Sequence, residues 1–287
     1  MRIILAVVLG LVVGAERAIA HPPVLGSSAV FAEGVPGPEG LAFANDGSLI
    51  VGTNDSRLLR FAPDGTSTVL AVLPDRPAGV TVARDGRILV AVFPLGSVYS
   101  VDPATGTPTL VASGINSPNF IVQTRSGRIL VSASAANTIV DVTDGTPVVR
   151  ASGLTFPNGL AIRKGFLYVA ETFANRVSRL ALAPDGTLGA PEVYATGISL
   201  ADGIAFDREG NLLAVGFDQL FVVPRGATAA TVLSNDAILN WPSNIAFGRG
   251  HGFRRKDMYL ANYGLPLGSG TNVLRLGYNH TGAPLIR

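Results

Sequence analysis

Three features of the sequence predict an all-β fold, a six-bladed β-propeller. A short motif recurs six times, its copies lie about 40 residues apart, and each copy is followed by further strand patterns. The chain of 287 residues also contains 34 glycines and 19 prolines among many Val, Ile and Leu residues. This composition favours short strands joined by tight turns. After the first 20 residues no stretch shows a clear helical period, so the prediction is all-β.

The first 20 residues match a secretory signal peptide. Met1 and Arg2 precede the apolar run from Ile3 to Ala15, and Ala18-Ile19-Ala20 supplies the small residues of a cleavage site. The run ends at Glu16 and is shorter than the roughly 20 residues that a membrane-spanning helix needs. We expect cleavage after Ala20, a mature domain of residues 21–287, and an exported protein, periplasmic or secreted, that is free of the membrane after cleavage.

The charge and the cysteine content of the chain limit which partners it can bind and which cross-links can stabilise it. The net charge is only +2 and the arginines are scattered, which argues against nucleic-acid binding. The chain has no cysteine, so disulfides and thiolate metal sites are excluded. We expect stability to come from core burial and strand pairing, and a small molecule to be the partner. The sequence does not determine the oligomeric state.

The repeated motif opens with Pro or Ala and continues as a short apolar strand. Its copies are Pro38–Phe43, Pro77–Val82, Pro118–Gln123, Pro157–Ile162, Ala201–Phe206 and Pro242–Phe247. Their second positions are separated by 39, 41, 39, 44 and 41 residues. Each copy is followed by a turn and further strand patterns, which predicts four antiparallel strands per blade.

The two ends of the mature chain are expected to meet in one blade. The last copy of the motif lacks a convincing fourth strand, whereas Ser28 to Gly34, before the first copy, has a fourth-strand pattern. An N-terminal strand that completes the last blade closes the ring and removes an exposed sheet edge.

Equivalent motif positions converge around the axis of a propeller, because the chain enters each blade at its innermost strand. The second positions form a predicted ring of Glu39, Ala78, Asn119, Asn158, Asp202 and Ser243. Glu39, Asp202 and the amide oxygen of Asn158 are hard oxygen donors carrying two negative charges. This donor set suits Ca²⁺ first, with Mg²⁺, Mn²⁺ or Zn²⁺ as alternatives. The competing interpretation is that Asn158-Gly159 and Asp202-Gly203 are ordinary turn dipeptides.

The motifs resemble those of the SMP-30/gluconolactonase family, the regucalcin-like propellers. The resemblance spans the mature chain and is most specific at three segments, Gly37-Pro38-Glu39-Gly40, Phe156 to Ala161 and Ala201 to Asp207. It implies that Glu39, Asn158 and Asp202 bind a divalent metal and that Asn119 lies beside the metal and the substrate. It also implies hydrolysis of a lactone.

Two departures from the family pattern bear on the substrate. Sugar-lactone members commonly carry Arg two residues before the third-motif Asn and Asp after it, whereas this chain has Ser117 and Phe120. A less polar lactone or ester is therefore as good a candidate as a sugar lactone. Four aromatic residues follow second strands on the face of the ring and are interpreted as an apolar pocket wall. They are Phe93, Phe173, Phe217 and Tyr263, which with Asn119 and Ser243 form the predicted substrate-binding set.

These observations predict a metal-dependent lactonase or esterase with Asp202 as the catalytic base. The chain has no cysteine and no Gly-x-Ser-x-Gly motif, and His251 and His280 lie in Gly-rich or polar loops where we expect them to be solvated. Two alternatives remain. One is a propeller enzyme of a biosynthetic pathway, catalysing a strictosidine-synthase-like condensation, cyclisation or isomerisation. The other is an exported, non-catalytic binding protein with NHL-like repeats.

Overall fold

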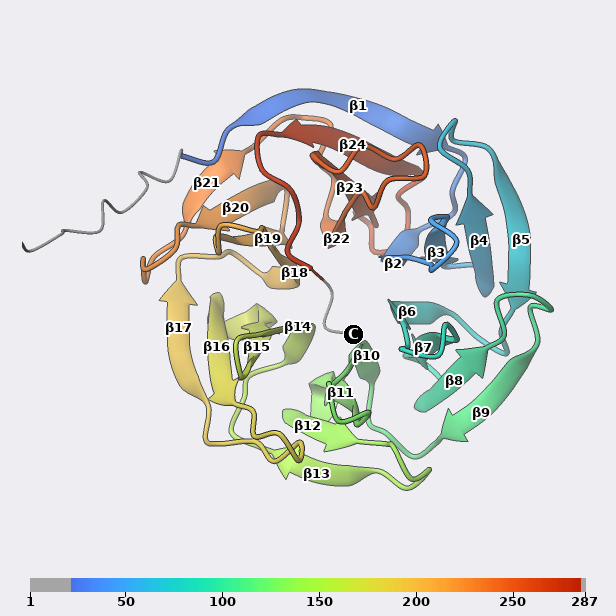
Figure 1. Ribbon diagram of the computed structural model, residues 1–287, viewed down its shortest axis with the longest axis vertical. Helices are drawn as coiled ribbons and strands as arrows, with labels where there is room; N and C mark the ends of the chain where they lie inside the picture. The colour runs from blue at the N-terminus through green and yellow to red at the C-terminus, as the bar shows by residue number, and fades with distance from the viewer. Residues whose placement is uncertain (1–21, 285–287) are drawn as a thin grey trace, which may run out of the picture.

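The computed structural model describes residues 22–284, in which six four-stranded antiparallel sheets surround a central axis (Figure 1). The predicted signal peptide lies outside the described residues. Blade 1 comprises β2 (Pro38–Phe43), β3 (Leu49–Thr53), β4 (Arg57–Phe61) and β5 (Ser67–Val72). Blade 2 comprises β6 (Pro77–Val82), β7 (Ile88–Val92), β8 (Ser97–Val101) and β9 (Pro108–Ala112). The predicted six-bladed propeller is confirmed.

The next three blades repeat this strand order from the axis outwards. Blade 3 comprises β10 (Pro118–Gln123), β11 (Ile129–Ala133), β12 (Thr138–Asp141) and β13 (Val148–Ala151). Blade 4 comprises β14 (Pro157–Arg163), β15 (Phe166–Glu171), β16 (Arg176–Ala181) and β17 (Glu192–Thr196). Blade 5 comprises β18 (Ala201–Phe206), β19 (Leu212–Gly216), β20 (Gln219–Val223) and β21 (Thr231–Ser234). Short 3₁₀ turns, η1 (Ser134–Ala136) and η2 (Thr172–Ala174), follow the second strands of blades 3 and 4.

Blade 6 is built from both ends of the described chain. Its inner strands are β22 (Pro242–Phe247), β23 (Asp257–Asn262) and β24 (Asn272–Tyr278), and its outer strand is β1 (Leu25–Glu33). β1 pairs antiparallel with β24, from Leu25 opposite Tyr278 to Glu33 opposite Asn272. The predicted closure by an N-terminal strand is confirmed, and the strand begins three residues earlier than the sequence pattern indicated.

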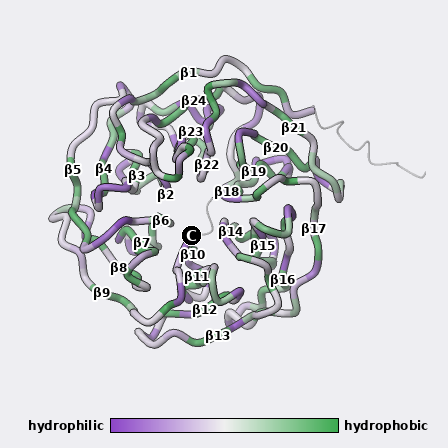
Figure 2. Tube along the Cα trace, turned by 180° about the vertical axis from the view of Figure 1, so that it is seen from behind, coloured by the Kyte–Doolittle hydropathy of each residue, from purple (hydrophilic) through white to green (hydrophobic). Residues whose placement is uncertain are grey.

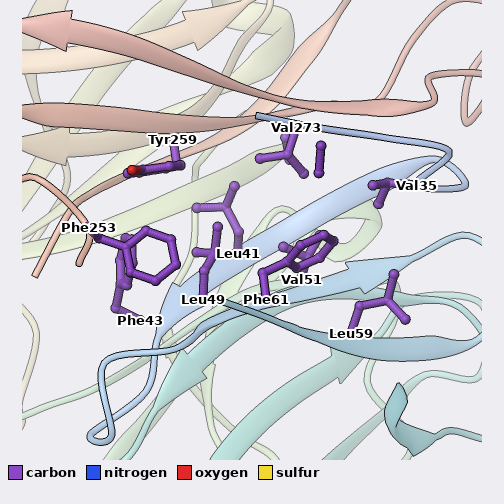
Figure 3. Close-up of a cluster of buried hydrophobic side chains, with 12 residues drawn as sticks. Val35, Leu41, Phe43, Leu49, Val51, Leu59, Phe61, Phe253, Tyr259 and Val273 are labelled. Atoms are coloured by element: carbon purple, nitrogen blue, oxygen red, sulfur yellow. The ribbon is translucent and has the colours of Figure 1, made fainter. Parts of the chain in front are cut away.

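The hydrophobic core lies between neighbouring blades. Second strands such as β3 and β7 are buried along their whole length, because sheets pack on both of their faces. One such layer joins blades 6 and 1, where Phe43, Phe61, Phe253 and Tyr259 pack together (Figure 3). Phe43 meets Phe253 edge to face with ring centroids 5.0 Å apart. Hydrophobic segments recur around the whole ring (Figure 2), so the blades stabilise one another in sequence.

No helix among the described residues has the length and apolar character required to cross a bilayer.

Candidate functional site

The inner strands bring the six predicted ring positions together at one end of the axis. In four blades the residue after the ring position is glycine, and an added Cβ would strike the next blade. At Gly203 that Cβ would lie 2.6 Å from the carbonyl oxygen of Ser243, and at Gly40 and Gly159 it would lie even closer to the carbonyls of Ala78 and Asp202. Glycine is therefore required for the close approach of successive inner strands. The ring closes where the Ser243 hydroxyl lies 3.0 Å from the Glu39 carbonyl oxygen.

A left-handed backbone turn precedes this ring in five of the six blades. The residues two positions before the ring have φ between +44° and +56°; they are Gly37, Ser117, Phe156, Leu200 and Trp241. A side chain other than glycine is disfavoured there by roughly 1 kcal/mol or more. Such backbone strain, repeated at one end of one axis, is typical of a functional surface.

Glu39 and Asp202 place two carboxylates in the same electrostatic environment. Burial raises the pKa of Glu39 from 4.5 to about 7, against the opposing positive charge of Arg76. Burial and then the charge of Glu39 raise the pKa of Asp202 well above its ordinary value. Each carboxylate therefore disfavours the ionisation of the other, and a cation between them would relieve the repulsion.

Asn158 supplies a neutral oxygen next to these carboxylates. Its side chain is buried, and its Nδ2 lies 3.3 Å from the Thr172 hydroxyl oxygen. That hydroxyl donates its proton to the Ala201 carbonyl at 2.8 Å, so it accepts from the Asn158 amide. The Asn158 amide also donates to Asp202, which lowers the Asp202 pKa. The Asn158 Oδ1 atom is left buried without a hydrogen-bond partner among the described residues.

This unpartnered oxygen is compatible with a hard divalent cation at the site. An unpaired buried amide oxygen costs roughly 1–3 kcal/mol, which a cation at that point would offset. Two carboxylates and one amide oxygen form a donor set of the kind that Ca²⁺ prefers. Glu39, Asn158 and Asp202, the three residues that the sequence selected, are the ones that would hold it.

Three residues beside this site were not fully anticipated from the sequence. The Trp241 side chain donates a hydrogen bond to Asp202, and its backbone N–H donates to Asp218 Oδ1 at 2.9 Å. Arg76 lies near enough to lower the Glu39 pKa and donates from Nη1 to Asn54 Oδ1 at 3.2 Å. Trp241 and Arg76 each lie two residues before a ring residue in the sequence, as Ser117 does. This shared position in the repeat was the signal that could have identified them as neighbours of the site. Tyr263 was predicted as part of an apolar wall. Burial, followed by the charge of Glu39, raises the pKa of its hydroxyl to about 12.

The predicted aromatic residues occupy the loops after the second strands, at the ring end of the axis. Phe93 and Tyr263 are half-buried, whereas Phe173 is 63% exposed and Phe217 is 44% exposed. Phe173 packs on Phe156 with ring centroids 4.5 Å apart, and Phe217 meets Trp241 edge to face at 5.8 Å. Phe156 and Trp241, each two residues before a ring residue, thus pack against Phe173 and Phe217. Together these side chains form an exposed apolar rim around the ring. Their binding role remains a prediction.

The other predicted contact residues are placed differently. Asn119 is 7% exposed within the ring, and Ser243 is 2% exposed with its hydroxyl against backbone carbonyls of blades 1 and 6. Phe120 packs in the core between blades 3 and 4 with Leu130 and Leu160. Ser243 therefore joins two blades, and its role in substrate binding also remains a prediction.

An apolar cavity of about 220 Å³ continues along the axis below the ring. Leu41, Val80, Phe120 and Ile204 line the cavity, as do Ala283 and Pro284 near the C-terminus. None of the six ring residues lines it. The polar site and this cavity therefore lie at different depths along the axis, and the inner strands below the ring form the walls of the cavity.

Comparison with known proteins establishes the fold. No known protein-family model matches the chain, and no curated protein matches its sequence. A gluconolactonase from Xanthomonas campestris is similar with a TM-score of 0.74 and 20% identity, over 91% of this chain and 96% of that one. A calcium-binding protein, regucalcin, from Agrobacterium tumefaciens is similar with a TM-score of 0.71 and 21% identity, over 90% and 99% of the two chains.

A virginiamycin B lyase from Staphylococcus aureus is also similar, with a TM-score of 0.62 and 14% identity over 89% of this chain and 99% of that one. The resemblance that the motifs predicted is therefore confirmed for the fold, because structures of gluconolactonase and regucalcin share the six-bladed arrangement. At these identities the likeness concerns architecture, and chemistry has to be argued from the site.

Proposed function

We propose that this protein is a metal-dependent hydrolase that opens a lactone or a related ester at the axial ring. The observation that carries the proposal is the buried, unpartnered Asn158 oxygen beside the Glu39 and Asp202 carboxylates, whose pKa values are raised. Polar groups held without partners at the end of an axis are suited to binding a cation and a substrate oxygen.

A divalent cation held by Glu39, Asn158 and Asp202, Ca²⁺ first, would supply positive charge that polarises the ester carbonyl and offsets the carboxylate repulsion. Asp202 is the proposed base. Burial and the charge of Glu39 raise the pKa of Asp202, and hydrogen bonds from Trp241 and Asn158 oppose this rise and hold the carboxylate in place. In this position Asp202 would accept a proton from the attacking water. The water oxygen bonds to the carbonyl carbon, the ring C–O bond breaks, and the leaving oxygen takes the proton.

Tyr263 is the proposed donor to the developing oxyanion. A pKa of about 12 keeps its hydroxyl protonated through the range in which Asp202 acts as a base. A hydroxyl donor aimed at the oxygen where charge develops is typically worth about 10²-fold or more in rate.

The exposed rim supports an apolar or aromatic acyl group in the substrate. Phe173 and Phe217 present apolar surface around the ring, and Ser117 and Phe120 supply no charged group beside Asn119. Aromatic and aliphatic lactones are therefore expected to react faster than gluconolactone.

Two measurements on one sample test the proposal. The metal-stripped protein is titrated with Ca²⁺, Mg²⁺, Mn²⁺ and Zn²⁺ while the fluorescence of Trp241, the sole tryptophan, reports binding beside Asp202. The loaded protein is then screened against sugar, aliphatic and aromatic lactones with a pH indicator. Asp202→Asn and Glu39→Gln are expected to abolish tight binding and activity, whereas Asn158→Ala weakens binding less because it removes no charge. Glu33→Gln, at an exposed glutamate of β1, is the matched control.

The two measurements separate the possible failures. If neither carboxylate variant changes the affinity for any of the four cations, the ring is structural. If cations bind at the ring but no lactone opens above background, hydrolysis is wrong and only the metal site remains.

A second candidate is a non-hydrolytic transformation in the same pocket, such as a condensation, cyclisation or isomerisation. Its support is the apolar rim together with the similar fold of a lyase. Reaction in ¹⁸O-labelled water distinguishes the two, because hydrolysis places solvent oxygen in the product and these reactions do not. We also propose export with cleavage after Ala20, for which the intact mass of the secreted protein is the test.

A further inference from the structure

A second group of metal-ligating side chains lies at the opposite end of β18 from Asp202. Asp207 and Glu209 follow β18, and His280 follows β24. One donor atom from each side chain, a carboxylate oxygen of Asp207, one of Glu209 and a ring nitrogen of His280, lies within 4.8 Å of the other two. His280 is 7% exposed, so the expectation of a solvated loop histidine is wrong for this residue, whereas His251 is exposed as expected.

Hydrogen bonds leave this group incompletely satisfied. His280 Nδ1 lies 3.0 Å from Asp207 Oδ2 and 3.4 Å from Glu209 Oε2, and one imidazole N–H does not serve both carboxylates well. Glu209 Oε2 is buried and has no hydrogen-bond partner within residues 22–284. An oxygen of a charged group in that state is costly unless a cation is close.

Asp207 is held rigidly for ligation. Its Oδ1 accepts the backbone N–H groups of Gly210 and Asn211, both at 2.8 Å. Its Oδ2 accepts from Asn211 Nδ2 at 2.6 Å and from the Tyr278 hydroxyl at 3.0 Å. Partners of this kind fix a ligating carboxylate in protein metal sites. A metal would replace only the contact to His280.

The two distances from His280 Nδ1 to the carboxylate oxygens are compatible with a coordination sphere. Neighbouring ligands held about 2.0–2.1 Å from an ion lie roughly 2.8–3.0 Å apart in an octahedral site and roughly 3.3–3.4 Å apart in a tetrahedral site. The two separations from His280 Nδ1, 3.0 Å and 3.4 Å, fall at these two values. One imidazole with two carboxylates suits Zn²⁺ better than Ca²⁺, which takes oxygen ligands.

We propose that Asp207, Glu209 and His280 form a second divalent-metal site, selective for Zn²⁺ and distinct from the axial ring. A water molecule completes the coordination. The ring site would then take a hard, oxygen-liganded cation at one end of β18, while the second site takes a borderline transition metal at the other end.

The position of His280 gives the second site a structural role. The segment after β24 runs from blade 6 to the axis (Figure 1). It is attached beneath blade 5 by Arg208 N–H donating to the Thr281 carbonyl at 2.8 Å and Ala283 N–H donating to the Phe206 carbonyl at 2.9 Å. Ala283 and Pro284 then line the axial cavity. A metal between His280 and blade 5 would fasten this segment against the axial cavity.

The experiment uses the full protein with the ring site disabled by Glu39→Gln and Asp202→Asn. After removal of metals it is titrated with Zn²⁺ by calorimetry and with Co²⁺ by absorption spectroscopy. We expect about one equivalent of each metal to bind, a Co²⁺ spectrum of low coordination number, and a higher Tm with Zn²⁺. Adding His280→Gln is expected to remove all three effects, and adding His251→Gln, at the exposed histidine, is the matched control.

A second variant guards against a folding defect in His280→Gln. Glu209 keeps 37% of its side chain exposed, so Glu209→Gln removes a ligand with little effect on packing. It is expected to weaken Zn²⁺ binding at least tenfold while the circular dichroism spectrum is unchanged. The proposal is overturned if the folded ring-disabled protein binds no Zn²⁺, or if Zn²⁺ affinity is the same in Glu209→Gln and the parent.

Discussion

Replacing Glu39 with glutamine is expected to stabilise the metal-free protein above neutral pH. Burial raises the pKa of Glu39 from 4.5 to about 7. A carboxyl group whose pKa is higher in the folded than in the unfolded state binds more protons when folded. Its contribution to the free energy of unfolding therefore becomes unfavourable as the pH rises from about 4.5 and is complete above about 7.

The size of this effect follows from the shift itself. At about 1.4 kcal/mol per pKa unit, ionised Glu39 destabilises the metal-free fold by about 3 kcal/mol near pH 8 and by about 1 kcal/mol near pH 5.5. The metal-free wild type should thus lose about 2 kcal/mol between those pH values from this residue. Asp202 adds to the loss, because its pKa is raised in the same direction. Glu39→Gln removes the first contribution and reduces the second.

Urea denaturation in the presence of a chelator measures this difference. The free energy of unfolding is compared for wild type and Glu39→Gln at about pH 5.5, 7 and 8, with Glu33→Gln as the exposed control. As the pH rises, the free energy of unfolding of the variant should increase relative to that of the wild type. Saturating Ca²⁺ should abolish or reverse this difference, because only the wild type binds Ca²⁺ tightly. A constant difference across the pH range would refute the electrostatic account of the ring.

Three further predictions concern other residues. Trp241→Phe keeps an aromatic ring but removes the donor to Asp202, and it is expected to weaken Ca²⁺ binding about tenfold in calorimetry, the usual effect of losing a hydrogen bond to a charged group. Gly159→Ala places a Cβ against the Asp202 backbone and is expected to lower stability by about 2 kcal/mol or more in urea, whereas Gly26→Ala, whose Cβ has no neighbour closer than 3.5 Å, is expected to change it little. Removal of residues 22–33 exposes the edge of β24 and is expected to lower the Tm, and adding the same segment as a peptide should restore it; an unchanged Tm after the removal would contradict closure by β1.

The repeat made most of the fold predictable from the sequence, together with the ring residues of the site. In a propeller, spacing along the chain determines position around the axis, so locating Glu39, Asn158 and Asp202 in six aligned motifs was enough to place them in one ring. The glycines after ring positions were visible for the same reason. Their function, the close contact with the next blade's carbonyl, became clear only with coordinates.

Contacts that do not obey the repeat were not predictable. Trp241 donates a hydrogen bond to Asp202, and Arg76 lies close enough to Glu39 to lower its pKa. Both contacts depend on the direction of a side chain across a blade boundary, which the spacing of the repeat does not specify. His280 was misjudged because its partner Asp207 is 73 residues away, and the segment after β24 that carries His280 returns to blade 5 outside the repeat. A polar loop sequence predicts solvation only when nothing distant packs on it.

The two ends of β18 illustrate how one inner strand supports two kinds of chemistry. At the upper end Asp202 has a raised pKa, lies beside a second carboxylate and neighbours an amide oxygen without a partner. At the lower end Asp207 has both oxygens occupied by donors and is fully buried. A cation at the upper end would add interactions that the protein does not make for itself, so ligand binding there is coupled to charge and substrate. A cation at the lower end would join this anchored carboxylate to Glu209 and His280, so binding there is coupled to the stability of the segment that carries His280. Removing the first metal should therefore abolish activity and, above neutral pH, also lower the Tm, because the ring carboxylates are left ionised without a cation. Removing the second should lower the Tm with little change in the activity of the folded protein.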